Sequence, residues 1–282
     1  MKNIYRLIVM SILFILPAFV LLSAWTFWEL SGERYKRTIP GNEIYRAIEK
    51  SKKKTNYKKL ILGDSAGNQI FNCKKEDPDS AYSLACNQGI SMVGHFLLLN
   101  NYLQAENRPD TVFMLVNPIT FSNNLGQVYT YHYFLKPFFT EEYIPYMSQT
   151  VLDQIHKIPR YNLCQNPYIK TSTRAWNPPA NPSEAKYSFI SPIAKEYLSK
   201  IDSLSHRYHF ELKIIPTPLP NSKREKMRKI DKSEYAGYNF KPLLDEYLSN
   251  LIYDDDRIFS DGIHLKDPSE YRKHYNKVLH VR

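Results

Sequence analysis

The hydrophobic and polar positions divide the chain into an apolar N-terminus, a polar connecting segment and a long region of alternating patterns. After Lys2 and Arg6, residues 7–28 form a run of 22 positions without a charged side chain. A helix of this length is about 33 Å long, which is enough to cross the hydrocarbon core of a bilayer. We therefore predict a short N-terminal tail at residues 1–6 and a transmembrane anchor at residues 7–28.

A cleaved signal peptide is the alternative explanation of this apolar run. Signal peptides have an apolar region of about 7–15 residues followed by small residues at the cleavage site. The run is longer than that, and Ser23-Ala24-Trp25 matches such a site poorly. Positive residues flank the run on both sides, so their count does not decide its orientation.

The segment that follows the apolar run is polar and rich in lysine. It covers residues 29–57 and contains Lys52-Lys53-Lys54 near its end. We interpret it as a basic juxtamembrane stalk or linker, in which residues 43–53 are the best candidate for a helix. The folded domain is then expected to begin at residue 58.

From Tyr57 onward, short apolar runs alternate with longer amphipathic stretches. This alternation is typical of strands joined by crossover helices, and it predicts an α/β fold with a mainly parallel, doubly wound sheet at residues 58–282. We expect strands at residues 59–62, 83–85, 111–116, 211–216 and 257–259, and helices at residues 91–106, 191–207, 242–250 and 268–279. The length of this region fits one sizeable core with an insertion.

Residues 118–187 interrupt the alternation and are rich in tyrosine and proline. We interpret them as an insertion that forms a lid or a substrate wall, since long ordered loops in compact domains are often functional. Tyr131, Tyr133 and Trp176 are candidate substrate-binding residues, because aromatic rings stack on sugars. The alternative is that these aromatic residues pack the insertion onto the main core.

Charge and cysteine content narrow the range of partners. The chain has a net charge of +10 and a pI near 9.2, and residues 223–229 are strongly basic. Such arrays bind nucleic acid in many proteins, but a chain anchored outside the cytoplasm meets anionic lipids and acidic glycans instead, so we predict no nucleic-acid partner. Cys73 and Cys86 either form a disulfide or stay unpaired. The chain has no zinc-binding Cys-x-x-Cys or His-Glu-x-x-His spacing, and we predict neither a metal nor a cofactor.

The candidate chemistry lies in two short motifs far apart in the sequence. Gly63-Asp64-Ser65 follows the first predicted strand, and Asp261 stands three residues before His264. Ser, His and Asp are the parts of an activated nucleophile, in which the imidazole removes the hydroxyl proton and the carboxylate fixes the tautomer of the imidazole. Each motif alone is also typical of an ordinary turn or helix cap. Together they predict a site for acyl transfer.

In their order and placement, these motifs resemble the SGNH/GDSL hydrolase superfamily. The resemblance places the nucleophile at Ser65 and the two other triad members at Asp261 and His264. It places an oxyanion-hole glycine at Gly89, within Asn87-Gln88-Gly89-Ile90-Ser91, which joins the Ser65 amide. The third family block, Gly-x-Asn-Asp, is absent: the strand at 111–116 runs into Asn117-Pro118. Asn117 is therefore the candidate for the last oxyanion donor, with Asn123 and Asn124 behind it.

The resemblance implies a three-layer, flavodoxin-like α/β sandwich and an esterase or O-acyltransferase that needs no cofactor. It is strongest to membrane-anchored envelope members, which implies a single-pass protein of the bacterial inner membrane with its catalytic domain outside the cytoplasm. The implied substrate is an acyl group, with acetyl expected, on an envelope polysaccharide, and transfer would involve a polytopic membrane partner as acyl donor. The alternative is a non-catalytic envelope protein of the same fold that binds glycan or an assembly partner.

Overall fold

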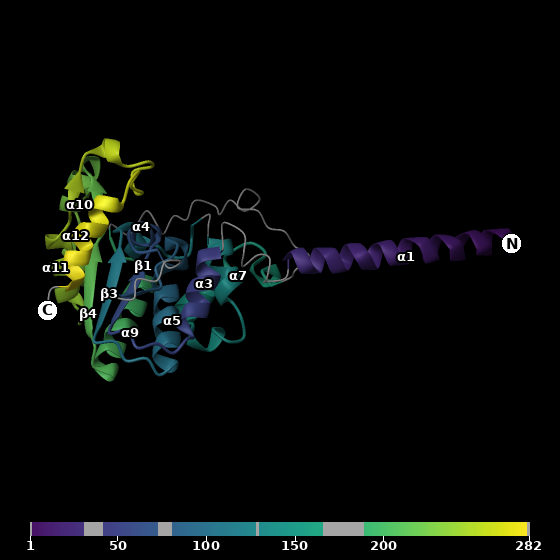
Figure 1. Ribbon diagram of the computed structural model, residues 1–282, viewed down its shortest axis with the longest axis horizontal. Helices are drawn as coiled ribbons and strands as arrows, with labels where there is room; N and C mark the ends of the chain where they lie inside the picture. The colour runs from purple at the N-terminus through teal and green to yellow at the C-terminus, as the bar shows by residue number, and fades with distance from the viewer. Residues whose placement is uncertain (1, 31–41, 73–80, 128–129, 166–188, 281–282) are drawn as a thin grey trace.

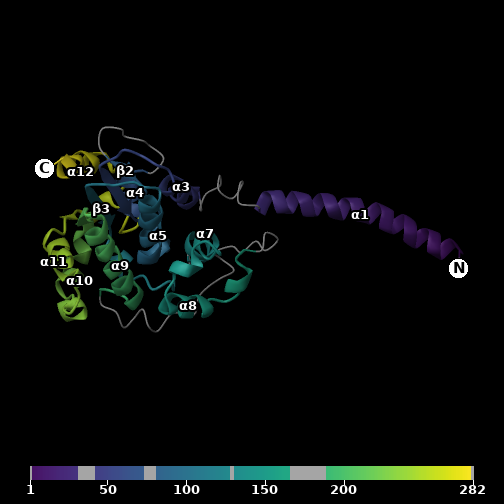
Figure 2. The same cartoon turned by 90° about the horizontal axis from the view of Figure 1, so that it is seen from below.

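The computed structural model describes residues 2–30, 42–72, 81–127, 130–165 and 189–280. Its first element is the helix α1, Lys2–Leu30, which extends away from the rest of the described chain in two perpendicular views (Figures 1 and 2). The stretch Lys2–Phe27 has a mean hydropathy of 2.7, and none of it is buried against other parts of the protein. One N-terminal helix is therefore long and apolar enough to cross a membrane, a property that an uncleaved anchor shares with a signal sequence.

The centre of the remaining chain is a parallel sheet of four strands in the order β2-β1-β3-β4. The strands are β1 (Lys59–Gly63), β2 (Tyr82–Ser83), β3 (Thr111–Val116) and β4 (Glu211–Pro216). The predicted α/β fold with a mainly parallel sheet is confirmed. A second, two-stranded parallel sheet joins β5 (Leu219–Pro220) to β6 (Tyr253–Asp254).

Side chains on both faces of the main sheet are buried. On β3, Val112, Met114 and Val116 belong to one hydrophobic cluster, whereas Phe113 and Leu115 belong to the other. Neighbouring side chains of a strand point to opposite faces, so this division places a cluster on each face of the sheet. Burial on both faces explains why the strand is an unbroken apolar run.

Helices cover both clusters. Buried side chains of α3 (Asn42–Ser51), α5 (Ser91–Gln104), α9 (Pro192–Tyr208) and α11 (Lys241–Ser249) lie in the first cluster, and those of α4 (Ser65–Ile70) and α12 (Ser269–His280) lie in the second. The shorter helices are α6 (Ile119–Ser122), α7 (Lys136–Phe138), α8 (Gln149–His156) and α10 (Arg224–Arg228). Figure 1 shows β1, β3 and β4 side by side between α12 and α5.

The segment predicted to be a stalk is part of the folded domain. Ile44, Ala47 and Ile48 of α3 are buried in the main core, and Asn101 of α5 donates a hydrogen bond to the hydroxyl of Ser51 at the end of α3. The assignment of residues 29–57 to a linker was therefore wrong for α3. The three apolar positions at spacings of three and four residues define a buried helix face, which the many lysines around them obscured.

The predicted strand at 257–259 is also wrong. The chain forms a 3-10 helix there, η8 (Asp256–Ile258), because the side chain of Asp255 accepts a hydrogen bond from the Arg257 amide at 2.9 Å. Phe259 then forms an isolated antiparallel bridge with Leu265. An aspartate that caps its own turn competes with extended structure. The bridge closes a loop that carries the second sequence motif.

His95 on α5 is completely buried, and burial lowers the pKa of its imidazole to about 3. Neither ring nitrogen has a hydrogen-bond partner among the residues that the structure describes. In the unfolded chain this histidine has a pKa near 6.5 and binds a proton more readily. Burial of His95 therefore does not lower the stability of the fold above about pH 6.5, but it lowers that stability progressively as the pH falls from 6.5 toward 3.

We expect a His95→Leu variant to lose less stability on acidification than the wild-type chain. Between pH 6.5 and pH 5, protonation of this histidine in the unfolded chain should lower the stability of the fold by about 2 kcal/mol, at ~1.4 kcal/mol per pH unit. Thermal unfolding of both full-length proteins in detergent, at pH 7 and pH 5, measures this difference. Equal losses in the two proteins would show that His95 does not couple to folding.

Candidate active site

Ser65 is the first residue of α4 and lies at the point where β1 ends. Asp64 caps the helix, because its Oδ1 accepts hydrogen bonds from the amides of Ala66 at 3.0 Å and Gly67 at 3.1 Å. A β-carbon at Gly67 would lie 2.3 Å from the carbonyl oxygen of Leu115, so only glycine lets α4 approach β3 this closely. The Ser65 amide belongs to the first turn of α4, whose N–H groups have no acceptor within the helix.

The carboxylate of Asp64 also holds the end of β3. Its Oδ2 accepts hydrogen bonds from the amide of Asn117 at 2.6 Å and from the hydroxyl of Thr120 at 2.7 Å. The side chain is fully buried. Burial raises the pKa of Asp64, and the four hydrogen bonds oppose that shift. Asp64 therefore fixes the serine-bearing turn to the neighbouring strand.

The second motif lies in the loop that the bridge between Phe259 and Leu265 closes. The Ser260 amide donates to the carbonyl of His264 at 2.8 Å, and Gly262 adopts a left-handed φ of 76°. Asp261 Oδ1 accepts hydrogen bonds from the main-chain amides of Ile263 at 3.1 Å and His264 at 2.8 Å. The carboxylate thus shapes its own turn, and its second oxygen remains for the histidine ring.

The structure brings Ser65, His264 and Asp261 together in one hydrogen-bonded chain. His264 Nε2 lies 2.8 Å from Ser65 Oγ, and His264 Nδ1 lies 2.7 Å from Asp261 Oδ2. Partial burial alone would raise the pKa of Asp261, but the hydrogen bonds from the His264 ring and from the turn amides lower it below the ordinary value. Asp261 is therefore charged at neutral pH. With the ring proton on Nδ1, His264 Nε2 is free to accept the proton of Ser65.

Gln69 connects the two motifs, and the sequence patterns did not indicate it. Its Oε1 accepts a hydrogen bond from the Leu265 amide at 3.0 Å, and its Nε2 donates to the Leu265 carbonyl at 3.2 Å. Gln69 stands four residues after Ser65, so both side chains lie on one side of α4. The two hydrogen bonds hold the backbone next to His264 against the helix that carries Ser65.

A cavity of about 110 Å³ borders the histidine loop. Gly262 and Ile263 line it from the loop, Asn117 from the end of β3, and Leu219 and Met227 from the segment that contains α10. Lys223 and Lys226 also line it, whereas Ser65 and His264 do not.

The predicted oxyanion donors Gly89 and Asn117 are engaged elsewhere. The Gly89 amide donates to Asn87 Oδ1 at 2.8 Å, within the 3-10 helix η1 (Gln88–Ile90). The Asn117 amide donates to Asp64, and its side-chain Nδ2 lies 3.4 Å from Thr217 Oγ1. A contact of 3.4 Å is long for a hydrogen bond, and Asn117 lines the cavity, so this side chain stays a candidate donor. Gly89 is not available in this conformation.

Gly89 has a packing role instead. A β-carbon there would lie 3.0 Å from Cβ of Tyr133, which belongs to the π-helix η2 (Tyr131–Leu135). Asn123 donates its side-chain amide to the Gln88 carbonyl at 2.8 Å and supports the same turn. Close contact between η1 and η2 therefore accounts for the glycine without an oxyanion.

The two aromatic candidates that the structure describes do not form an open substrate wall. Tyr131 and Tyr133 are 2% and 7% exposed and belong to the main core. For these two rings, the packing alternative is correct. Both lie in the hydrophobic core, where burial of their apolar surface stabilises the fold. Trp176 lies outside the described residues. Cys73 does too, so the structure does not decide between a disulfide with Cys86 and an unpaired cysteine.

These residues are arranged for nucleophilic chemistry: a hydroxyl in contact with an imidazole, which in turn contacts a charged carboxylate. The sequence predicted that these three side chains belong to one site, and their catalytic roles stay a prediction. Comparison of the chain with models of protein families finds no match, and comparison with curated proteins finds none either.

Proposed function

We propose that this chain is a membrane-anchored serine esterase or O-acyltransferase of the SGNH/GDSL type. The observation that carries the proposal is the hydrogen-bonded chain from Ser65 through His264 to Asp261, with contacts of 2.8 Å and 2.7 Å. These residues come from two motifs 199 positions apart. The position of Ser65 at the carboxyl end of β1, where β1 and β3 lead to opposite sides of the sheet, is the usual place for a ligand site in such sheets.

In the proposed reaction, Ser65 Oγ attacks the carbonyl carbon of an ester while His264 Nε2 takes its proton. The tetrahedral intermediate collapses as His264 returns this proton to the leaving alcohol, which leaves an acyl group on Ser65. Water or a sugar hydroxyl then attacks this acyl-enzyme, again with His264 as the base. Asp261 stabilises the imidazolium at each stage. The Ser65 amide, together with a reoriented Asn117 side chain, would stabilise the oxyanion.

A short acyl group, such as acetyl, is the group that we propose is transferred, because the resemblance to envelope members of the superfamily implies it. Helices on both faces of the sheet support the finer assignment of a three-layer, flavodoxin-like sandwich. We further propose that α1 anchors the chain in a bacterial inner membrane and that the catalytic domain faces outward. The substrate is then an acylated envelope polysaccharide, and transfer requires a polytopic acyl-donor partner.

A second candidate is a non-catalytic envelope protein that keeps this fold and binds glycan or an assembly partner. The observation that favours it is the hydrogen bond from the Gly89 amide to Asn87 Oδ1, which leaves this amide unable to donate to an oxyanion. Loss of one oxyanion donor lowers the rate of an acyl-transfer enzyme by about 100- to 1000-fold. The two candidates differ in whether Ser65 is reactive.

A serine-reactive fluorophosphonate probe tests the reactivity of Ser65 directly. We expect the full-length protein in detergent to form one covalent adduct at Ser65, located by mass spectrometry, and we expect His264→Ala to label far more slowly. Ser203→Ala, which changes an exposed serine on α9, is the matched control and should label like the wild type. Well-folded protein that shows no adduct at Ser65 would favour the non-catalytic candidate.

We expect Gln69→Ala to slow labelling of Ser65 by about tenfold, because loss of the two bonds to Leu265 costs ~1 kcal/mol or more in positioning. Gln69→Glu keeps the acceptor for the Leu265 amide, so it should recover part of the rate. Labelling rates at several probe concentrations separate reactivity from probe binding. If Gln69→Ala labels at the wild-type rate, the two bonds do not position His264.

A further inference from the structure

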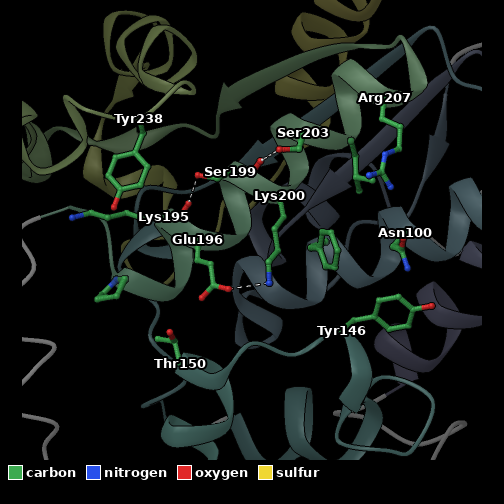
Figure 3. Close-up of a pocket in the computed structure, with 13 residues that line it drawn as sticks. Asn100, Tyr146, Thr150, Lys195, Glu196, Ser199, Lys200, Ser203, Arg207 and Tyr238 are labelled. Atoms are coloured by element: carbon green, nitrogen blue, oxygen red, sulfur yellow. Dashed lines mark hydrogen bonds and ion pairs between the residues drawn. The ribbon is translucent and has the colours of Figure 1, made fainter.

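A large groove lies along α9, and none of the residues in the proposed triad lines it. Its volume is about 890 Å³, and α9, α5 and the segment around Tyr146 form its walls (Figure 3). Lys195, Ser199, Ser203 and Arg207 line it at intervals of four residues along α9. Such spacing places the four side chains in one row. The helix from Pro192 to Arg207 is roughly 22 Å long, which suits an extended ligand.

The charge of the groove is positive. Three cationic side chains, Lys195, Lys200 and Arg207, line it with a single carboxylate, that of Glu196. Glu196 forms an ion pair with Lys200 at 2.9 Å, which Figure 3 shows in the middle of the groove. Neither Lys195 nor Arg207 forms an ion pair with a carboxylate of the described residues, so both cations can receive a negatively charged ligand.

Two exposed tyrosines add an aromatic surface. Outside α1, Tyr146 and Tyr238 are the large hydrophobic side chains that the described part of the chain exposes, at 37% and 40%. Both line this groove. Tyr238 lies beside Lys195, and Tyr146 lies beside Asn100, on either side of the α9 row (Figure 3). Exposed aromatic rings that gather in one concave site mark a place where a ligand binds.

We propose that this groove binds a segment of an acidic polysaccharide whose sugars carry carboxylate groups. Aromatic faces pack on the apolar faces of sugar rings. Lys195 and Arg207 receive the carboxylates, for which the planar guanidinium is well suited. Asn100 offers an amide for sugar hydroxyls. An open groove with this mixture of groups fits a polar polymer better than a compact apolar molecule.

The groove and the cavity beside the histidine loop border the same segments. Phe189 lines the cavity, and Pro192, three residues later, lines the groove. The rings of Phe189 and Tyr235 lie 6.0 Å apart, and Tyr238 follows Tyr235 by three residues. Phe189 and Tyr235 are buried, so these segments pack together between the two sites. The binding itself does not require a reactive Ser65, so this inference stands apart from the proposed esterase activity.

The test is binding of a hexamer of galacturonic acid to the full-length protein in detergent, measured by calorimetry, with neutral maltohexaose as comparison. We expect saturable binding of the acidic hexamer that weakens with added salt. The double variant Tyr146→Ala/Tyr238→Ala should bind about tenfold more weakly or worse, equivalent to ~1.4 kcal/mol. The corresponding double change to phenylalanine should retain most of the affinity, since it keeps both rings.

Charge variants complete the experiment. Lys195→Gln/Arg207→Gln should weaken binding by a similar factor, whereas Lys54→Gln/Lys58→Gln removes the same charge outside the groove and should change it little. The proposal is overturned if the acidic hexamer does not bind, if all variants bind alike, or if a glutamate hexapeptide binds as tightly as the sugar. Ser65→Ala should bind normally, and the groove variants should keep fluorophosphonate labelling, so failure of one proposal is distinguishable from failure of the other.

Discussion

Replacing His264 with alanine should lower the rate of short-chain ester hydrolysis by about 100- to 10,000-fold, the usual contribution of a general base. The measurement is hydrolysis of p-nitrophenyl acetate by full-length protein in detergent. His264 Nε2 lies 2.8 Å from Ser65 Oγ, and no second imidazole is placed to accept that proton in the described residues. The double variant Ser65→Ala/His264→Ala should be no slower than either single variant, since the two groups act as a unit.

Asp261→Asn is the sharper comparison, because it keeps the shape of the loop. Asparagine retains an oxygen for the amides of Ile263 and His264, but its NH2 group would face His264 Nδ1. The ring would then carry its proton on Nε2, where it cannot accept from Ser65, and in serine proteases this change costs about 10,000-fold. Wild-type rates in both His264→Ala and Asp261→Asn would exclude the triad as the source of hydrolysis.

The sequence was sufficient to predict the parallel sheet and the contact of Ser65, His264 and Asp261, for a shared physical reason. β3 and β4 were predicted with the observed bounds. β3 is buried on both faces and is a nearly unbroken apolar run, whereas β4 alternates between buried and more exposed side chains, as a strand with one covered face does. Ser65 and His264 stand in short motifs whose local turns depend on neighbouring residues, such as the caps formed by Asp64 and Asp261. Features that local interactions determine can be recognised in a single chain.

Features that depend on tertiary contacts could not be recognised in this way. The role of Gln69 requires that the loop after Phe259 folds back onto α4, and no pattern near Gln69 shows that. The Gly89 amide was predicted to face an oxyanion, but it donates a hydrogen bond to the side chain of Asn87, two residues away. The packing of α3 was not predicted because its few apolar positions lie among charged residues. The helical spacing of these apolar positions was nevertheless present in the sequence.

The groove along α9 also depends on tertiary contacts that the sequence pattern does not show. Lys195, Ser199, Ser203 and Arg207 follow a helical repeat that is typical of any solvated helix face. Tyr146 and Tyr238 come from segments about ninety residues apart, and only the fold brings them to one surface. The groove holds only a small part of the basic charge noted in the sequence, because none of residues 223–229 lines it.

Asp64→Ala is expected to be the most destabilising single substitution around the site. Asp64 accepts four hydrogen bonds, from the amides of Ala66, Gly67 and Asn117 and from the hydroxyl of Thr120. Alanine leaves these buried donors without an acceptor, at ~1–3 kcal/mol for each that water does not reach. A total of about 4 kcal/mol or more is a large part of the 5–15 kcal/mol that stabilises a typical domain.

Three variants distinguish this role from a general effect of mutation in the core. Asp64→Asn keeps one oxygen for the α4 cap but places its NH2 group against the Asn117 amide, so we expect a smaller loss than with alanine. Thr120→Val removes one hydrogen bond and should cost about 1–2 kcal/mol. Thermal unfolding of the full-length proteins in detergent gives the order wild type, Thr120→Val, Asp64→Asn, Asp64→Ala. An Asp64→Asn protein as stable as the wild type would mean that Asp64 is protonated in the folded chain, as its burial favours, and that hydrogen bonds to a charged carboxylate do not hold β1 to β3.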